Sequence, residues 1–237
     1  MLTKIEKYKY EIIQPSDTDL IERAAKCLAD TFTGIQVGEK WIQEPIIGYA
    51  LKLQNLDFYN FVKDYIMQFV AQGYCAVALD DNREVVGAFV GDHNAFDIGS
   101  FPTYEGSFSD MNLVADVLDD IDERFLIDQQ LRTGKELQDG EVLHIFLIGV
   151  SAATHRQEVI TQLGSLLEER ARQNGIRMML AEATNPKSIR VFCDCYGFEK
   201  YQTVDGEQIV HKYEDNERLS VIPKTMADGI YIVTKQL

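Results

Sequence analysis

The residues most suited to bind a ligand directly follow an apolar run at Val142–Val150. The polar side chains of His155, Arg156 and Gln157 stand in the turn that connects this run to a helical pattern. The first turn of a helix offers free backbone N–H groups and the positive end of the helix dipole, which together attract anions. The segment therefore predicts a site for a pyrophosphate-bearing ligand. An ordinary strand-to-helix connection that binds nothing is the alternative.

Other polar side chains carry weaker signals. His144 lies within the apolar run, where a histidine is more often a satisfied core residue than a base. His93 and His211 stand in polar surroundings. No metal-ligand constellation appears in the sequence, and the cysteines lack zinc-finger spacing, so we expect no metal and reduced thiols. These cysteines are Cys27, Cys75, Cys193 and Cys195.

The charge of the chain narrows the classes of partner. Its 38 acidic and 23 basic side chains give a formal net charge of -15. Such a surface repels nucleic-acid phosphates and anionic lipids, and it attracts cationic small molecules such as amines. A surface that only confers solubility is the alternative. No apolar run approaches the ~20 residues of a membrane span, and residues 1–13 lack the apolar core of a secretion signal, so we expect a soluble, cytoplasmic protein.

The hydrophobic pattern predicts one α/β domain over residues 1–237, with strands and helices alternating around a mixed central sheet. The expected helices carry the apolar stripes of residues 20–32, 58–69 and 160–171, and a fourth begins at Pro186. Residues 91–140 fit less well, and we interpret them as an insertion with a solvated acidic helix. The expected strands are residues 8–14, 74–79, 84–90, 142–150, 176–183, 200–204 and 229–234.

Four segments, taken in order, resemble the GNAT acyltransferase family. The segment that resembles motif A is VLHIFLIGVSAATHRQEVITQLGSLLEERARQNG, and the segment that resembles motif B is MLAEATNPKSIRVFCDCYGFEKY. The strands that precede motif A are resembled by YCAVALDDNREVVGAFVG. A further segment, WIQEPIIGYALKL, resembles the Glu-Pro segment of the arylalkylamine N-acetyltransferase branch. The resemblance implies the GNAT fold, acetyl-CoA as co-substrate and transfer of an acetyl group to a primary amine.

The resemblance also implies where the co-substrate lies. The strand segment 147–150 would pair with the pantetheine at a bulge, with which Gly149 is compatible. The motif A turn would hold the pyrophosphate, but Glu158 and Ile160 occupy positions where the family has small residues. The rival interpretation is therefore a degenerate GNAT protein that binds CoA or a partner without catalysis. The expected co-substrate residues are Ile148, Val150, Arg156, Gln157, Val159, Ile160, Thr161, Asn185 and Phe192.

The catalytic residues implied by the resemblance come from two segments. Many GNAT enzymes place a tyrosine acid in motif B, but that position falls on Phe192 or Cys193 here, and Tyr196 comes a turn late. The arylalkylamine branch instead implies Glu44 as the base, with hydroxyls at Thr184 and Ser188.

Plain structural roles remain the alternatives for these three residues: an exposed loop acid for Glu44, a cap for Thr184 and a helix-face residue for Ser188. A protein N-terminus or lysine is a rival acceptor. The sequence does not decide between a monomer and a homodimer.

Overall fold

The computed structural model describes residues 7–94, 101–151 and 156–237 of the chain. A mixed eight-stranded sheet runs through it, in the order β1-β4-β5-β6-β7-β10-β8, with β9 also paired to β10. The strands are β1 (Lys9–Ile12), β4 (Cys75–Leu79), β5 (Val85–Asp92), β6 (Val142–Val150), β7 (Met178–Ala183), β8 (Glu199–Lys200), β9 (Val210–Lys212) and β10 (Gly229–Gln236). The pairing of β6 with β7 is parallel, and the other pairings are antiparallel. The predicted α/β class with a mixed central sheet is confirmed.

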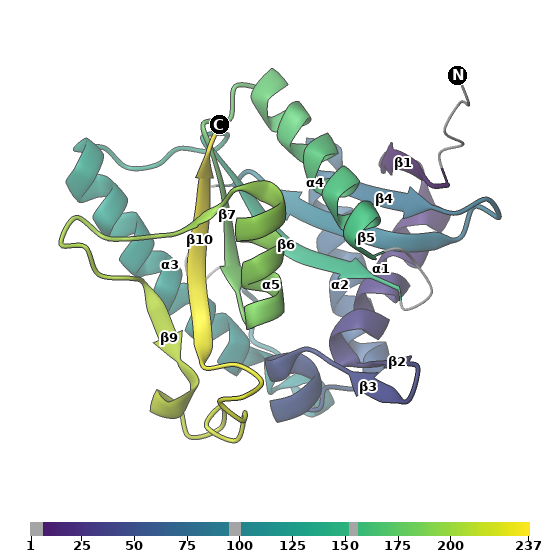
Figure 1. The fold of residues 1–237 in the computed structure, drawn as a ribbon, viewed down its shortest axis with the longest axis horizontal. Helices are drawn as coiled ribbons and strands as arrows, with labels where there is room; N and C mark the ends of the chain where they lie inside the picture. Colours follow the sequence, from purple (N-terminus) through teal and green to yellow (C-terminus); the bar gives the residue numbers. More distant parts are fainter. Residues whose placement is uncertain (1–6, 95–100, 152–155) are drawn as a thin grey trace.

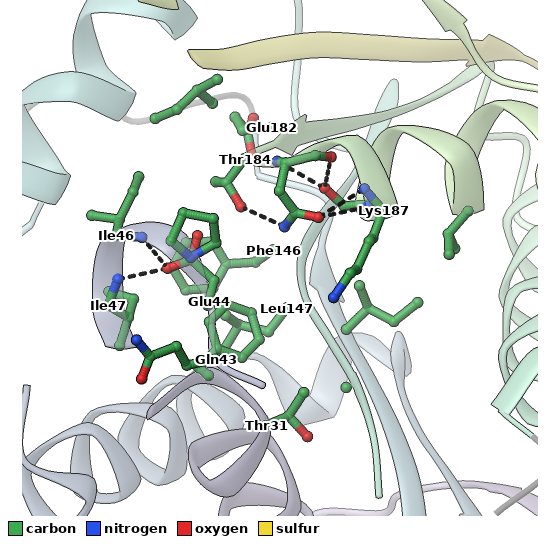
Figure 2. A pocket seen from close by; sticks show the side chains of 18 of the residues that line it. Thr31, Gln43, Glu44, Ile46, Ile47, Phe146, Leu147, Glu182, Thr184 and Lys187 are labelled. Atoms are coloured by element: carbon green, nitrogen blue, oxygen red, sulfur yellow. Dashed lines mark hydrogen bonds between the residues drawn. The ribbon is translucent and has the colours of Figure 1, made fainter. Parts of the chain in front are cut away.

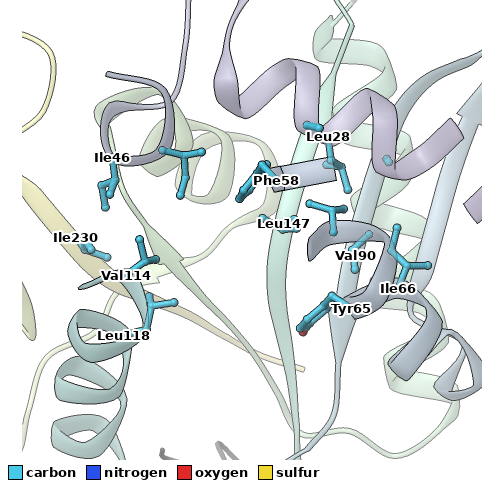
Figure 3. Packing of buried hydrophobic residues seen from close by; sticks show 14 of the residues in the cluster. Leu28, Ile46, Phe58, Tyr65, Ile66, Val90, Val114, Leu118, Leu147 and Ile230 are labelled. Carbon is cyan, nitrogen blue, oxygen red and sulfur yellow. The ribbon is translucent and has the colours of Figure 1, made fainter. Parts of the chain in front are cut away.

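Helices cover both faces of this sheet (Figure 1). On one face lie α1 (Thr18–Thr33), α2 (Asn55–Phe69) and α3 (Met111–Thr133), and on the other lie α4 (Arg156–Gln173) and α5 (Pro186–Arg190). Each face has its own cluster of buried apolar side chains. Figure 3 shows the first cluster, in which Leu28, Phe58 and Leu147 lie close together. The sheet is therefore buried on both faces, which explains the almost continuous apolar run of β6.

Helix α1 shows how the sequence sets the position of a helix on the sheet. Leu20, Ala24 and Leu28 repeat at helical spacing and are buried. The helix crosses β6 at Gly149, where an added Cβ would lie 3.0 Å from Leu28 Cδ2 and from Thr31 Oγ1. A side chain at this position would require its neighbours to move by a few tenths of an ångström, whereas glycine allows the approach as it stands. Gly149 therefore serves the contact between helix and strand.

The prediction for the acidic helix is half right. Residues 111–133 form α3, but this helix is not solvated all round, because Met111, Ile121 and Phe125 are buried in the core. Its two buried acids, Asp122 and Asp128, also lie on the covered face. The helix is thus an integral wall of the domain.

Short elements account for the other differences from the prediction. A hairpin of β2 (Ile35–Val37) and β3 (Lys40–Ile42) follows α1 and was not predicted. The strand expected at 200–204 is limited to β8, and β9 was not predicted. The expected motif B helix is split into α5 and a π-helical turn at Val191–Cys195. Another π-helical turn, Pro45–Ala50, precedes α2 and borders the site described below.

Candidate active site

The candidate site begins where two parallel strands separate. β6 and β7 are paired only as far as His144 and Leu180, and beyond this point their pairing ends. A cleft of 510 Å³ opens there, lined by Ile145–Val150 of β6 and by the end of β7. The backbone groups of β6 that would otherwise pair with β7 face this cleft, so they need partners from elsewhere. The two parallel strands therefore diverge along the cleft.

The bulge lies earlier than predicted. In the pairing of β5 with β6, Val90 is opposite Leu147 and Gly91 is opposite Ile145, which leaves Phe146 as the extra residue. We expected the bulge at 147–150 and associated it with Gly149. The register places it at Phe146 instead, because a bulge puts two residues of one strand opposite one of the other.

Glu44 lies at the cleft wall and begins the π-helical turn Pro45–Ala50. Its Oε2 accepts hydrogen bonds from the backbone N–H groups of Ile46, at 2.7 Å, and Ile47, at 2.6 Å (Figure 2). The side chain is buried, with 9% exposure. The alternative of an exposed loop acid is therefore wrong. The carboxylate caps a helical turn, a role that fixes its position.

The environment of Glu44 raises its pKa to about 7, mainly because burial penalises the charged form. The N–H groups of Ile47 and Ile46 and the nearby Thr184 hydroxyl act in the opposite direction. The second oxygen, Oε1, has no hydrogen-bond partner among the described residues. A fixed carboxylate with a free oxygen and a pKa near neutrality has the properties of a general base.

The three motif B residues lie together at the end of β7. Asn185 caps α5, because its side chain accepts from the N–H groups of Lys187 and Ser188. The Ser188 hydroxyl bonds the backbone of Asn185 in return and completes a capping box. All three of Thr184, Asn185 and Ser188 line the cleft. The structure thus places both predicted hydroxyls in the same cleft as Glu44, with Ser188 engaged in a cap.

The predicted co-substrate residues divide into two groups. Ile148, Val150, Ile160, Asn185 and Phe192 line the cleft. The Val159 side chain is fully buried against the sheet, so only its backbone could meet a ligand. Gln157 and Thr161 are on α4 outside the cleft lining, and Arg156 is the first residue of α4. His155 lies outside the described residues.

The unusual residues of motif A differ in their surroundings. The Glu158 side chain is exposed, whereas Ile160 lines the cleft where the family pattern has a small residue. Tyr196 packs over Gly164 of α4, where an added Cβ would lie 2.2 Å from its ring. Its hydroxyl donates to the Ile160 carbonyl oxygen, and burial raises its pKa. Tyr196 is thus a packing residue, away from the cleft lining.

Sequence reasoning missed three residues of this site. Lys187 and Arg190 are exposed cations on α5 that line the cleft. Tyr213 is fully buried and donates a hydrogen bond of 2.6 Å to the Thr184 carbonyl oxygen. The two cations could have been noticed, because the expected helix after Pro186 places both in its first two turns. Tyr213 could not, since it is 29 residues from its partner.

Comparison with solved structures identifies the architecture. An arylalkylamine N-acetyltransferase 2 from Aedes aegypti superposes with a TM-score of 0.66 at 15% identity, over 97% of this chain and 98% of the other. The Drosophila melanogaster polyamine N-acetyltransferase gives a TM-score of 0.63 at 14% identity, over 97% and 100%. This chain has the GNAT fold.

A third GNAT-fold neighbour is the condensation domain of Ebony in complex with beta-alanyl-dopamine. It superposes with a TM-score of 0.63 at 14% identity, over 98% of this chain and 99% of the other. No family model and no curated protein sequence matches the chain. In the part of the chain that the structure describes, no helix is both long and apolar enough to cross a membrane.

Proposed function

We propose that this GNAT-fold protein is an N-acetyltransferase that moves the acetyl group of acetyl-CoA to a small primary amine within a ternary complex. The observation that carries the proposal is Glu44, a residue that lines the cleft and whose buried Oε1 has no hydrogen-bond partner of standard geometry among the described residues. The structural neighbours named above include N-acetyltransferases of arylalkylamines and polyamines, which supports an amine acceptor.

The chemistry requires two proton transfers and one exchange of bonds. An amine arrives mostly as its ammonium at neutral pH, and Glu44 would remove the proton that prevents attack. The neutral amine nitrogen then forms a bond to the acetyl carbon, the bond from that carbon to sulfur breaks, and the second proton lost by the nitrogen passes to the departing thiolate. Backbone N–H groups of the β6 segment 147–150 would polarise the carbonyl oxygen, and the Ser188 hydroxyl would donate toward the departing sulfur.

The residues of the cleft fit a long, phosphate-bearing co-substrate. The unpaired edge of β6 offers backbone partners for the amide groups of a pantetheine chain. Lys187 and Arg190 provide local positive charge at the cleft in a chain whose net charge is -15. Cations of this kind bind phosphate oxygens through charge-assisted hydrogen bonds. Ile148 and Val150 add apolar contact.

Two measurements on the purified protein test the proposal. Titration calorimetry with acetyl-CoA should show saturable binding, and release of free thiol from acetyl-CoA should require both the protein and a primary amine. A panel of arylalkylamines and agmatine covers the acceptors of the structural neighbours. Binding without thiol release for any amine would favour the non-catalytic GNAT protein, for which the bulk of Ile160 in the cleft is the supporting feature. Absence of binding at millimolar acetyl-CoA would refute the proposal.

A further inference from the structure

A second cavity of 490 Å³ lies next to the cleft, on the face of the sheet that α2 and α3 cover. It is bounded by α2, by the segment 101–108, by α3 and by the first half of β6. Phe61 and Phe146 line both cavities and thus form the shared wall. None of the residues assigned above to catalysis or co-substrate binding lines this second cavity.

The charges around this cavity are almost all negative. Its lining contains five carboxylates, and among the described residues that line it the only basic side chain is His144. The carboxylates are Asp57, Asp64, Asp92, Asp119 and Asp122. They extend from the exposed Asp64 at the rim to Asp122, which is 8% exposed. Such a gradient of carboxylates draws a cation inward.

The remaining walls are aromatic. Tyr65 stacks on Phe146 with ring centroids 4.4 Å apart and contacts Phe69 at 4.7 Å. Phe108 and Tyr104 make an edge-to-face pair with centroids 5.1 Å apart. Aromatic faces attract cations and also pack against hydrocarbon. Acidic groups combined with aromatic walls suit an organic cation better than a hydrated metal ion.

Most hydrogen-bonding capacity at the inner end of the cavity is already used. Asp92 accepts from the Tyr65 hydroxyl and from the Asn94 N–H, and it lies 3.3 Å from His144 Nδ1. His144 Nε2 lies 2.8 Å from Glu182 Oε2. These contacts make a closed network in which Asp92 and His144 hold each other in place.

Two buried carboxylate oxygens remain outside this network. Asp122 Oδ1 and Glu182 Oε1 have no hydrogen-bond partner of standard geometry among the described residues. The Glu182 side chain is 4% exposed, and the two carboxyl groups are close enough to interact directly. Two adjacent buried carboxylates are stable only when one is protonated or a cation joins them, because like charges repel strongly away from water. A cation with N–H groups would therefore relieve this repulsion in place of a proton.

We propose that the second cavity binds an organic primary ammonium ion, whose N–H groups donate to Asp122 and whose carbon skeleton packs on the aromatic walls. A primary ammonium carries three donors, so it can satisfy Asp122 Oδ1 and still bond other oxygens. A quaternary ammonium has none and would leave Asp122 unsatisfied. The site is distinct from the cleft that contains Glu44.

The test measures binding of 2-phenylethylammonium to the full chain by titration calorimetry without acetyl-CoA, so its result does not depend on catalysis. The neutral analogue 2-phenylethanol has the same ring and chain and should bind at least tenfold more weakly. Asp122→Asn removes the ionisable group at constant size and should weaken amine binding about tenfold or more. Phe69→Leu changes a wall of the second cavity alone and should weaken binding severalfold.

Two variants serve as matched controls. Asp116→Asn makes the same charge change on the exposed side of α3 and should bind the amine like the wild type. Glu44→Gln alters the cleft and should retain binding in the second cavity. The proposal is overturned if the amine does not bind at about 10 mM, if 2-phenylethanol binds equally well, or if Glu44→Gln abolishes binding while Asp122→Asn and Phe69→Leu do not.

Discussion

The cleft and the second cavity lie side by side, yet the buried carboxyl groups in them have opposite surroundings. In the cleft, which Glu182 also lines, Glu44 is held by two backbone N–H groups. In the second cavity, Asp122 faces Glu182 near a network of Asp92, His144 and Tyr65. A group held only by neutral dipoles can gain or lose a proton without disturbing charged neighbours. A group in a charged network cannot.

This difference fits the two proposals, which place proton transfer in the cleft and cation binding in the second cavity. Burial raises the pKa of Glu44 to about 7, so both of its protonation states are populated at neutral pH. Burial and the charge of Glu182 raise the pKa of Asp122 well above its usual range. Burial lowers the pKa of His144, but the carboxylates of Glu182 and Asp92 outweigh burial and raise it well above its usual range. A cation that enters beside Asp122 would replace the shared proton. The following predictions test this division, from the largest expected effect to the smallest.

The largest effect is expected for Glu44→Gln. Glutamine keeps the size and the ability to accept the N–H groups of Ile46 and Ile47, but it cannot take a proton. Under the proposed mechanism kcat should fall by about 10²–10⁴-fold, whereas the dissociation constant of acetyl-CoA should stay nearly constant. Steady-state rates and calorimetry check both quantities. Full activity of Glu44→Gln at neutral pH would remove Glu44 from the mechanism.

The pH dependence of the rate should differ between the two proteins. Glu44 must be ionised to act as a base, so kcat/KM of the wild type should fall about tenfold for each pH unit below a pKa of about 7 and level off above it. In Glu44→Gln this fall in rate at low pH should disappear. The difference in rate between Glu44→Gln and the wild type should shrink at high pH, because more of the amine is then neutral. If the rate of both proteins falls at low pH with the same midpoint, the group that titrates is not Glu44.

A smaller effect is expected for the double variant Lys187→Ala with Arg190→Ala. Loss of two exposed cations from the cleft should weaken acetyl-CoA binding about tenfold, and the loss should decrease at high salt because exposed charges are screened. The control is Lys135→Ala with Lys212→Ala, which removes two exposed cations outside the cleft lining. Equal affinity in both double variants would show that α5 does not hold the phosphates.

The smallest effect is expected for Ser188→Ala. Its hydroxyl takes part in the capping box of α5, so the free energy of unfolding should fall by about 0.5–1 kcal/mol. If the hydroxyl also assists the leaving sulfur, kcat should fall severalfold beyond any loss of folded protein. Denaturant unfolding and kcat are therefore measured together, with Ser165→Ala on exposed α4 surface as the control. A stability change with unaltered kcat would limit Ser188 to capping.

The sequence predicted those parts of the fold in which one segment determines its own structure. The apolar run of β6 and the helical period of α4 are strong local signals, and both elements were expected in their observed places. The hairpin β2–β3 was missed because three-residue strands around Gly38 are too short to show an alternating pattern. Long elements such as β6 and α4 were therefore predicted, and strands of three residues were not.

The candidate site was predictable only through the family pattern, and only in part. Glu44, Thr184 and Ser188 were placed together by that pattern, and the structure brings all three to one cleft. The second cavity could not be foreseen, because its charged residues come from α2, from α3 and from separate strands of the sheet. Asp122 in particular looked like one more solvated acid of a helix rich in acids, and only tertiary packing reveals that it is buried.

The position of Glu44 as a helix cap has a consequence for the order of events in a catalytic cycle. A carboxylate accepts hydrogen bonds more strongly than a neutral carboxyl does. If Glu44 takes the proton of the amine, the hydrogen bonds that it accepts from the N–H groups of Ile46 and Ile47 weaken at that moment. The turn Pro45–Ala50 would be held firmly while substrates assemble and more loosely once the product has formed. Release of the product and restoration of the base would then be timed by one and the same proton.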